Sequence, residues 1–192
     1  MTIPGIDMVV AVRMMAAIGR FATAEKLVAC PGLNPSVRQS GDGRAHHGRI
    51  TKRGSSRARH LPVEAAWQTV RSPGPMRAFY ERVRARRGAH IAAVAVARKL
   101  AVLIWHMLTK AEDYAWGRPL LMARKLRNLE LAAGQAAKPG TRGRAYEYGI
   151  LERRQADRAQ AEQAERAYRR ITEHWRRQNK KDGAGAAREV RH

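Results

Sequence analysis

The chain has 192 residues, and its 38 Lys and Arg outnumber its 16 Asp and Glu to give a net charge of +22. This excess makes an ordinary metabolic enzyme a poor first hypothesis, because so large a surplus attracts polyanions, of which nucleic acid is the commonest. Because 44% of the residues are apolar, the chain can still form a core and is not simply a disordered basic tail. An acidic membrane surface is the rival partner.

Cysteine content and the N-terminus indicate the compartment. Cys30 is the single cysteine, so no intramolecular disulfide and no Cys-rich zinc site can form. The first twenty residues lack both a basic segment and a cleavage site of the kind that secretory signals carry. The apolar stretch 90–108 has Arg98 and Lys99 at its centre, where insertion into a membrane costs about 2.5 to 3.5 kcal/mol per charge. We therefore expect a cytoplasmic protein in which this stretch is a buried core helix.

Apolar residues recur at spacings of three and four, which predicts a mainly α fold. Pro62 suits the first turn of a helix, and Gly19, Gly88 and Gly134 stand where helices would end. Residues 30–60 are rich in Gly, Ser, Arg and His and predict an ordered loop or short hairpin. The expected helices are Met8–Ile18, Thr23–Ala29, Pro62–Val70, Met76–Arg87, Ala89–Thr109, Leu120–Ala133 and Ala145–Asn179.

The composition divides the chain into four parts. We expect a helical domain over 1–110, a helical extension and linker over 111–143, a long charged helix over 144–179 and a disordered tail over 180–192. The boundary before the long helix rests on the small residues, Pro and Gly of 134–143. The long helix carries Glu and Arg at i,i+4 spacing in three pairs, which are Glu162–Arg166, Glu165–Arg169 and Glu173–Arg177.

The first candidate functional segment is residues 3–19, a Pro-Gly turn followed by an apolar helix. It is similar to the start of a helix-hairpin-helix module, in which turn amides face a DNA phosphate. Gly5 would allow close approach, and the helix N-terminus would supply unpaired donors. Asp7 would oppose phosphate, and a plain capped helix packed on the core explains the same residues.

The second candidate segment is residues 37–60, where one acid, Asp42, faces a cluster of cations. Guanidinium groups on a glycine-rich loop can follow a phosphate backbone, and Gly41 is one of four glycines that let this loop bend. Its serines lie near His46 and His47, so a serine activated as a nucleophile is conceivable, as is a solvated loop that binds nothing specific. The candidate nucleic-acid ligands are Arg38, Arg44, Arg49, Lys52, Arg53, Arg57 and Arg59.

Other residues admit a functional and a structural interpretation. The adjacent His46 and His47 cannot both easily face one tetrahedral ion, so we expect no metal site in this chain. Aromatic residues among the basic ones could stack on bases, although such residues more often anchor helix packing. These aromatic residues are Tyr114, Trp116, Tyr146 and Tyr148.

Three motifs in order carry a resemblance to a known family. They are PGLNP at 31–35, a serine and glycine at 40–41 leading to GRITKRG at 48–54, and VAVARKL at 94–100. From about residue 3 to 108 the chain resembles the C-terminal transposase domain of the insertion-sequence transposases that include the Piv-type DNA invertases. A looser similarity continues through residues 110–134.

The resemblance implies an RNA-guided DNA recombinase built from two domains. One is a RuvC-like domain whose four acids bind divalent metal, and the other resembles this chain and supplies a serine nucleophile, which corresponds to Ser40. Ser55 and Ser56 stand where bulkier residues are usual in the family. The sequence shows no RuvC-like domain, so the leading hypothesis is a truncated transposase, inactive alone, in the bacterial nucleoid. DNA, a guide RNA and a second copy or a full-length transposase are its expected partners, with no membrane.

Two other hypotheses stay open at this point. The chain could be a helical nucleic-acid-binding protein without catalytic activity, in which Ser40 is an ordinary loop residue. It could also be a membrane-surface or structural protein that uses its Arg-rich C-terminal helix.

Overall fold

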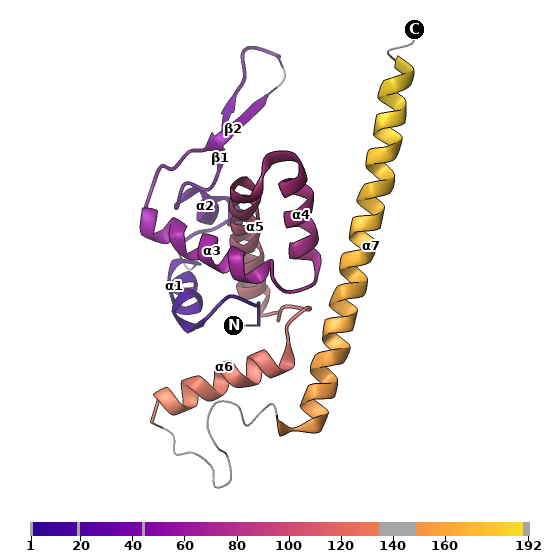
Figure 1. Cartoon of the computed structure of the whole chain (residues 1–192). Coiled ribbons are helices and arrows are strands. Elements are labelled where there is room, and N and C mark those ends of the chain that lie inside the picture. The colour runs from indigo at the N-terminus through magenta and orange to yellow at the C-terminus, as the bar shows by residue number, and fades with distance from the viewer. Residues whose placement is uncertain (1, 19, 44, 135–148, 190–192) are drawn as a thin grey trace.

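The computed structural model describes residues 2–18, 20–43, 45–134 and 149–189. The described residues form seven helices and a two-stranded antiparallel sheet, as Figure 1 shows. The prediction of a mainly α fold is therefore confirmed. In chain order the elements are α1 (Met8–Ile18), α2 (Ala24–Ala29), β1 (Pro35–Arg38), β2 (His46–Ile50), α3 (Ser56–Thr69), α4 (Pro75–Arg87), α5 (Ala89–Lys110), α6 (Pro119–Ala132) and α7 (Leu151–Glu189).

Helix α5 is the centre of the hydrophobic core. It packs against α2, α3 and α4, and small side chains such as Ala92, Ala93 and Ala97 let these helices approach closely. Val96 and Leu100 are fully buried on the same helix. By length and composition α5 could cross a membrane, but in this fold it is the core helix that the sequence predicts.

The N-terminal turn is tied to the C-terminal end of α3. Gly5 has φ +88, and a Cβ there would lie 2.7 Å from the carbonyl oxygen of Ala65. The buried Thr69 hydroxyl donates to the carbonyl of Pro4 at 2.7 Å. Glycine is therefore required by close contact with α3 as well as by the backbone angle.

A lysine from α6 holds the same turn from the other side. The Nζ of Lys125 donates to the carbonyls of Ile3 and Ile6 at 3.1 and 2.8 Å. Burial lowers the pKa of the Lys125 ammonium, while the charge of Asp7 opposes that shift. This contact joins α6 to the N-terminal segment.

Helix α3 begins earlier than the sequence predicts. Ser55 is its N-cap, and the Ser55 hydroxyl accepts a hydrogen bond from the backbone N–H of Ala58 at 3.2 Å. Pro62 consequently lies in the helix interior, so its predicted position in the first turn is wrong. The Ser55 hydroxyl satisfies a backbone N–H of the first helical turn, which has no carbonyl partner within the helix. Proline has no side-chain oxygen and cannot serve as such a cap.

Helices α6 and α7 meet at a buried carboxylate. Asp157 of α7 forms an ion pair with Arg118 and accepts from the backbone N–H of Leu120 at the start of α6. Farther along α7, the guanidinium groups of α4 lie over its aromatic rings. Arg77 is 5.2 Å from the ring centroid of Tyr168. These contacts join α7 to α6 and to α4, and α7 runs alongside α4 in Figure 1.

The boundaries of α7 differ from those expected. The helix begins at Leu151, and residues 135–148, which include the expected start at Ala145, lie outside the described residues. It continues to Glu189, whereas the sequence predicts a disordered tail from residue 180. The Ala, Lys and Arg content of this stretch favours helix despite Gly183 and Gly185. Of the three expected Glu–Arg pairs, the described structure contains Glu165–Arg169, at 3.4 Å.

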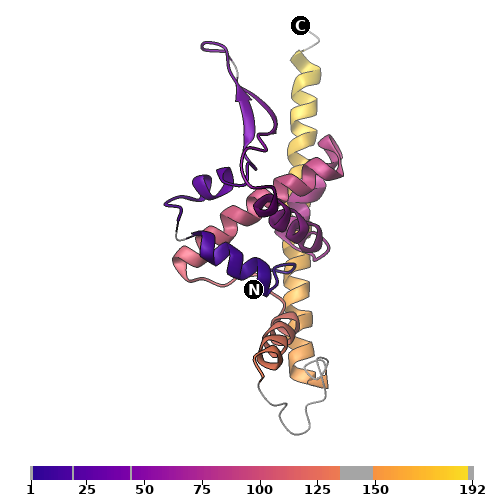
Figure 2. The same ribbon diagram turned by 90° about the vertical axis from the view of Figure 1, so that its left-hand side faces the viewer.

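Figures 1 and 2 agree that the tip of the β1–β2 hairpin and the C-terminal end of α7 extend toward the same end of the molecule. The helical core lies at the base of both projections. The fold therefore presents two projecting segments on one side.

Candidate nucleic-acid interface

The segment for which the sequence predicts a loop or hairpin is a hairpin. Strand β1 pairs with β2 in antiparallel register, with Val37 opposite His47 and Arg38 opposite His46. Nearly every side chain of this hairpin is exposed, and Val37 is 56% exposed. The hairpin therefore adds little to the core, and its stability depends on how its base is attached.

Two family-like motifs meet at the base of the hairpin, in a contact that we call the neck, formed by residues 30–34 and 51–54. The backbone N–H of Thr51 donates to the carbonyl of Asn34 at 2.8 Å, and that of Lys52 donates to the carbonyl of Gly32 at 3.1 Å. A Cβ on Gly54, which has φ +111, would lie 1.9 Å from the Cys30 carbonyl oxygen. The neck thus brings two backbones closer than any residue with a side chain allows.

The guanidinium of Arg59 reinforces the neck. Its Nη1 donates to the carbonyls of Pro31 and Lys52 at 2.9 and 3.2 Å. Among the predicted nucleic-acid ligands, Arg59 therefore has a structural partner on both sides of the neck. Lys52 adopts φ +55, a conformation that this set of contacts holds in place.

The other predicted cations are arranged differently from Arg59. Their side chains are exposed, and no ion pair joins them to a carboxylate within the described part of the chain. Unpaired surface guanidinium and ammonium groups remain available to phosphate. These residues are Arg38, Arg49, Lys52, Arg53 and Arg57, while Arg44 lies outside the described residues.

The structure separates the loop serines by their hydrogen bonds. The Ser36 hydroxyl donates to the carbonyl of Arg49 at 3.1 Å and packs against Gly48. The Ser55 hydroxyl caps α3. Ser40 lies in the turn of the hairpin, where its carbonyl accepts from Gly43, and its hydroxyl has no hydrogen-bond partner among the described residues. Ser40 thus differs from Ser36 and Ser55 in having an exposed hydroxyl without a structural partner.

The remaining predicted site residues fall in separate places. Gly5 faces α3 in the core, far along the chain from the hairpin. Gly41 lies next to Ser40 with φ +54, and no atom lies within 4 Å of where its Cβ would stand. Tyr114 is partly buried against the core, and Tyr146 and Tyr148 lie outside the described residues. The structure therefore does not gather these residues into one site.

Metal ligands do not gather in the described part of the chain. No group of three or more His, Cys, Asp or Glu side chains lies close enough there to hold an ion. The described residues therefore do not form the acidic metal site that the resemblance implies for the other domain. His46 and His47 are adjacent residues of β2.

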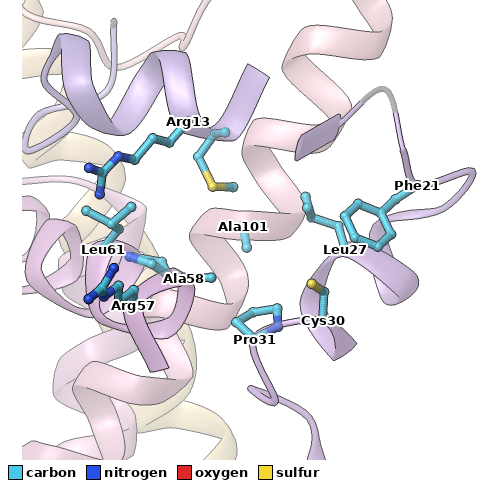
Figure 3. A pocket seen from close by; sticks show the side chains of 11 residues that line it. Arg13, Phe21, Leu27, Cys30, Pro31, Arg57, Ala58, Leu61 and Ala101 are labelled. Atoms are coloured by element: carbon cyan, nitrogen blue, oxygen red, sulfur yellow. The ribbon is translucent and has the colours of Figure 1, made fainter. Parts of the chain in front are cut away.

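Arg13 is a cation near this region that the sequence did not single out. It belongs to α1 and, with Arg57 of α3, borders a cavity lined by apolar side chains, as Figure 3 shows. One feature of the sequence could have identified Arg13, because it is the one charged residue in the apolar helix MVVAVRMMAAI.

The N-terminal part of the chain is similar to a known protein family. Residues 1–81 match the family described as Transposase IS116/IS110/IS902 family. The match contains α1, α2, the whole hairpin with its neck, and α3. This part of the chain is similar to insertion-sequence transposases.

The chain is also similar to one curated insertion-sequence transposase. The transposase for insertion sequence element IS1111A of Coxiella burnetii (strain RSA 493 / Nine Mile phase I) is 32% identical over 123 residues. That alignment covers 60% of this chain and 34% of the relative, so the chain spans about a third of the relative's length. No solved structure matches the chain. The transposase-like region therefore includes the neck and hairpin described above.

Proposed function

We propose that this chain is the DNA-contacting part of an insertion-sequence transposase, with the β1–β2 hairpin as its principal nucleic-acid contact. The observation that carries this proposal is the hairpin itself, an exposed basic projection that the neck holds to the core inside the family-matched residues. Its cations lack carboxylate partners in the described structure, so phosphate can take that position.

The proposal assigns Ser40 as the nucleophile for DNA strand transfer. Two of the other loop serines have structural roles, because Ser36 bonds the opposite strand and Ser55 caps a helix. The Ser40 hydroxyl lies free in a glycine-containing turn, two residues from Arg38. Nearby guanidinium charge stabilises the negative charge that develops on a phosphoryl group under attack.

The remainder of a full-length transposase supplies the other half of this reaction. The chain spans about a third of its curated relative, and no acidic metal site lies among its described residues. We therefore propose that it acts on DNA at the bacterial nucleoid together with a full-length copy and a guide RNA, and that it does not cut DNA alone.

The test combines binding with covalent trapping. Purified chain is titrated with labelled DNA between low and physiological salt, and it is incubated with DNA, full-length transposase and guide RNA to detect a DNA–protein adduct. We expect affinity to fall by orders of magnitude as salt rises, and we expect an adduct on Ser40. Absence of salt dependence would remove the electrostatic argument for the hairpin.

Serine substitutions make the assignment specific. Ser40→Ala should abolish the adduct and leave DNA affinity within a few fold, because one hydroxyl adds little to a cationic surface. Ser36→Ala and Ser56→Ala are the matched controls and should retain the adduct. An adduct that survives in Ser40→Ala and disappears in either control would transfer the role to that serine.

The second candidate function is nucleic-acid binding without catalysis. The exposed position of Ser40 favours it, since the described residues show no general base hydrogen-bonded to that hydroxyl. Salt-dependent binding with no adduct in the presence of the full-length transposase would support this alternative.

A further inference from the structure

Beside the neck lies an apolar cavity that the proposed function does not use. It is lined by residues of α1, α2, α3 and α5 and of the segments that flank α2, and it has a volume of about 230 Å³. Figure 3 shows side chains from these separate elements directed at a common space. Apolar side chains form most of its wall, and these include Met14, Phe21, Leu27, Pro31, Leu61 and Ala101.

Two cations stand on one side of this cavity. In Figure 3 Arg13 and Arg57 lie on the side of the cavity opposite Phe21 and Leu27, with Leu61 between them. None of the lining residues is an acid, and neither arginine forms an ion pair within the described residues. The site therefore combines an apolar interior with unneutralised positive charge at its edge.

We propose that this cavity binds one unstacked base of a nucleic-acid strand, with Arg13 and Arg57 on the adjacent phosphates. This inference rests on the proposed nucleic-acid binding and names a subsite for it. A base has flat apolar faces that apolar walls and an aromatic ring can cover, while its neighbouring phosphates are anionic. The cavity matches this pattern, because its walls are apolar and two arginines stand at its edge.

The size of the cavity supports a single base. Small-ligand pockets usually measure about 300–1,000 Å³, so this one lies just below that range and has room for one ring system but not for a base pair. The cavity is partly open to solvent, which leaves the polar edge of a base in contact with water. An enclosed apolar cavity would instead leave that edge without hydrogen bonds.

The cavity is also continuous with the proposed interface. Cys30 and Pro31 belong to both the neck and the cavity wall, and Arg57 follows the basic segment at the start of α3. A strand whose phosphates follow the hairpin to its neck would therefore reach the edge of the cavity.

Cys30 provides a direct test, because it is the only cysteine in the chain and it is exposed on the cavity wall. The alkylation rate of Cys30 is measured alone, with a saturating single-stranded oligonucleotide, and with an oligonucleotide of equal length whose residues are abasic. DNA and RNA versions of both strands are compared. We expect the base-containing strand to slow alkylation at least fivefold, and the abasic strand to change it less than twofold.

A cavity-filling substitution gives the second measurement. Ala58→Phe places a ring in the cavity, and Ala159→Phe, on the exposed side of α7, is the matched control. Ala58→Phe should reduce affinity for the base-containing strand by about fivefold or more, the smaller end of what one stacked base contributes, and should not change affinity for the abasic strand. Ala159→Phe should change neither.

Arg13→Gln and Arg57→Gln test the phosphate contacts. Both side chains are exposed, so we expect these variants to fold normally. Each should weaken binding of both strands and restore alkylation of Cys30, whereas Arg158→Gln on α7 should not.

The outcomes separate this inference from the proposed function. Binding of both strands with equal affinity, and with no protection of Cys30, would overturn the base subsite and leave nucleic-acid binding intact. Failure of every oligonucleotide to bind would overturn both. Protection of Cys30 by either DNA or RNA bases, lost in Ala58→Phe, would establish the subsite and identify the type of strand.

Discussion

The β1–β2 hairpin and helix α7 are both rich in arginine, but the surroundings of those arginines differ. Residues 37–60, which include most of the hairpin, one side of the neck and the start of α3, contain seven Lys and Arg against one acid, whereas α7 contains eleven against seven acids. In α7 acids alternate with the cations, and Arg169 pairs with Glu165. The described hairpin cations have no such partner.

The two regions also attach to the core by different means. Helix α7 is held by side chains, through the Asp157 ion pair and the rings of Tyr168 and Trp175 under arginines of α4. The hairpin is held by backbone contacts at Gly32 and Gly54. The difference shows that net charge alone does not locate a binding surface. The two regions differ instead in whether their cations have acidic neighbours, and on this difference the proposed interface rests.

The largest effect is expected from breaking the neck. In Gly54→Ala the new Cβ would lie 1.9 Å from the Cys30 carbonyl oxygen at φ +111, so the backbones must separate. We expect a loss of more than about 3 kcal/mol in unfolding free energy, or detachment of the hairpin. Urea denaturation measures the change in unfolding free energy. Gly41→Ala at the tip, with φ +54 and open space around it, should cost only about 1 kcal/mol. Equal losses at the two glycines would contradict the neck.

The next effect distinguishes the two basic regions by DNA affinity. A triple variant with Arg49→Ala, Lys52→Asn and Arg53→Ala removes three hairpin charges, and asparagine tolerates the positive φ of Lys52. It should lower the salt slope of binding by about 2 to 3 and reduce affinity by roughly a hundredfold at low salt.

The matched control for that variant removes three exposed arginines of α7. The combination of Arg158→Ala, Arg166→Ala and Arg170→Ala should reduce affinity several fold less, because neighbouring acids already weaken the field there. Filter binding across a salt series measures both. Similar losses would mean that total charge, and not the hairpin, determines affinity.

A smaller effect tests the attachment of α7. Asp157 is buried and bonds both Arg118 and the N–H of Leu120, so Asp157→Ala leaves a buried donor without its acceptor. We expect a loss of about 2 kcal/mol in unfolding free energy with little change in DNA affinity. Glu162→Ala, exposed on the same helix, should change stability by less than about 0.5 kcal/mol. A large loss of DNA binding in Asp157→Ala would connect α7 to the interface.

The smallest effect is a loss of folding stability at high pH, caused by Tyr114 in the segment between α5 and α6. Burial raises the pKa of Tyr114 to about 12, compared with about 10 in an unfolded chain. The unfolded state therefore releases its proton first. Stability is fully present below pH 10 and should fall by about 1 kcal/mol by pH 11 on account of this group. Tyr114→Phe should remove that part of the decline, with Tyr168→Phe as control. Equal declines in both variants would contradict it.

Much of the helical architecture could be predicted from periodicity. The spacing of apolar residues predicts α1 with its observed bounds and places α4 and α5 within a residue. The start of α3 was missed because Pro62 is a more conspicuous sequence signal than the Ser55 cap, although the cap determines where the helix begins. Similarly, the charge-rich stretch after residue 180 indicated disorder, whereas its helix-forming residues continue α7.

The candidate site was only partly predictable. Composition identified the basic segment and its glycines, because charge and backbone flexibility are properties of residues. Composition could not assign Arg59 to the neck, since that depends on carbonyls of Pro31 and Lys52 from its two sides. It also could not relate Arg13 to Arg57, which belong to helices far apart in sequence.

The sequence by itself determined that this protein is helical, strongly basic and similar to insertion-sequence transposases, because periodicity, charge and motifs are local properties of the chain. Only the tertiary structure decided which glycines join two backbones, which arginines are occupied by carbonyls, and which loop serines are held in structural hydrogen bonds. Such distinctions depend on contacts between residues distant in sequence. No local pattern records these contacts, because they form only when the neck closes against α3 and α5.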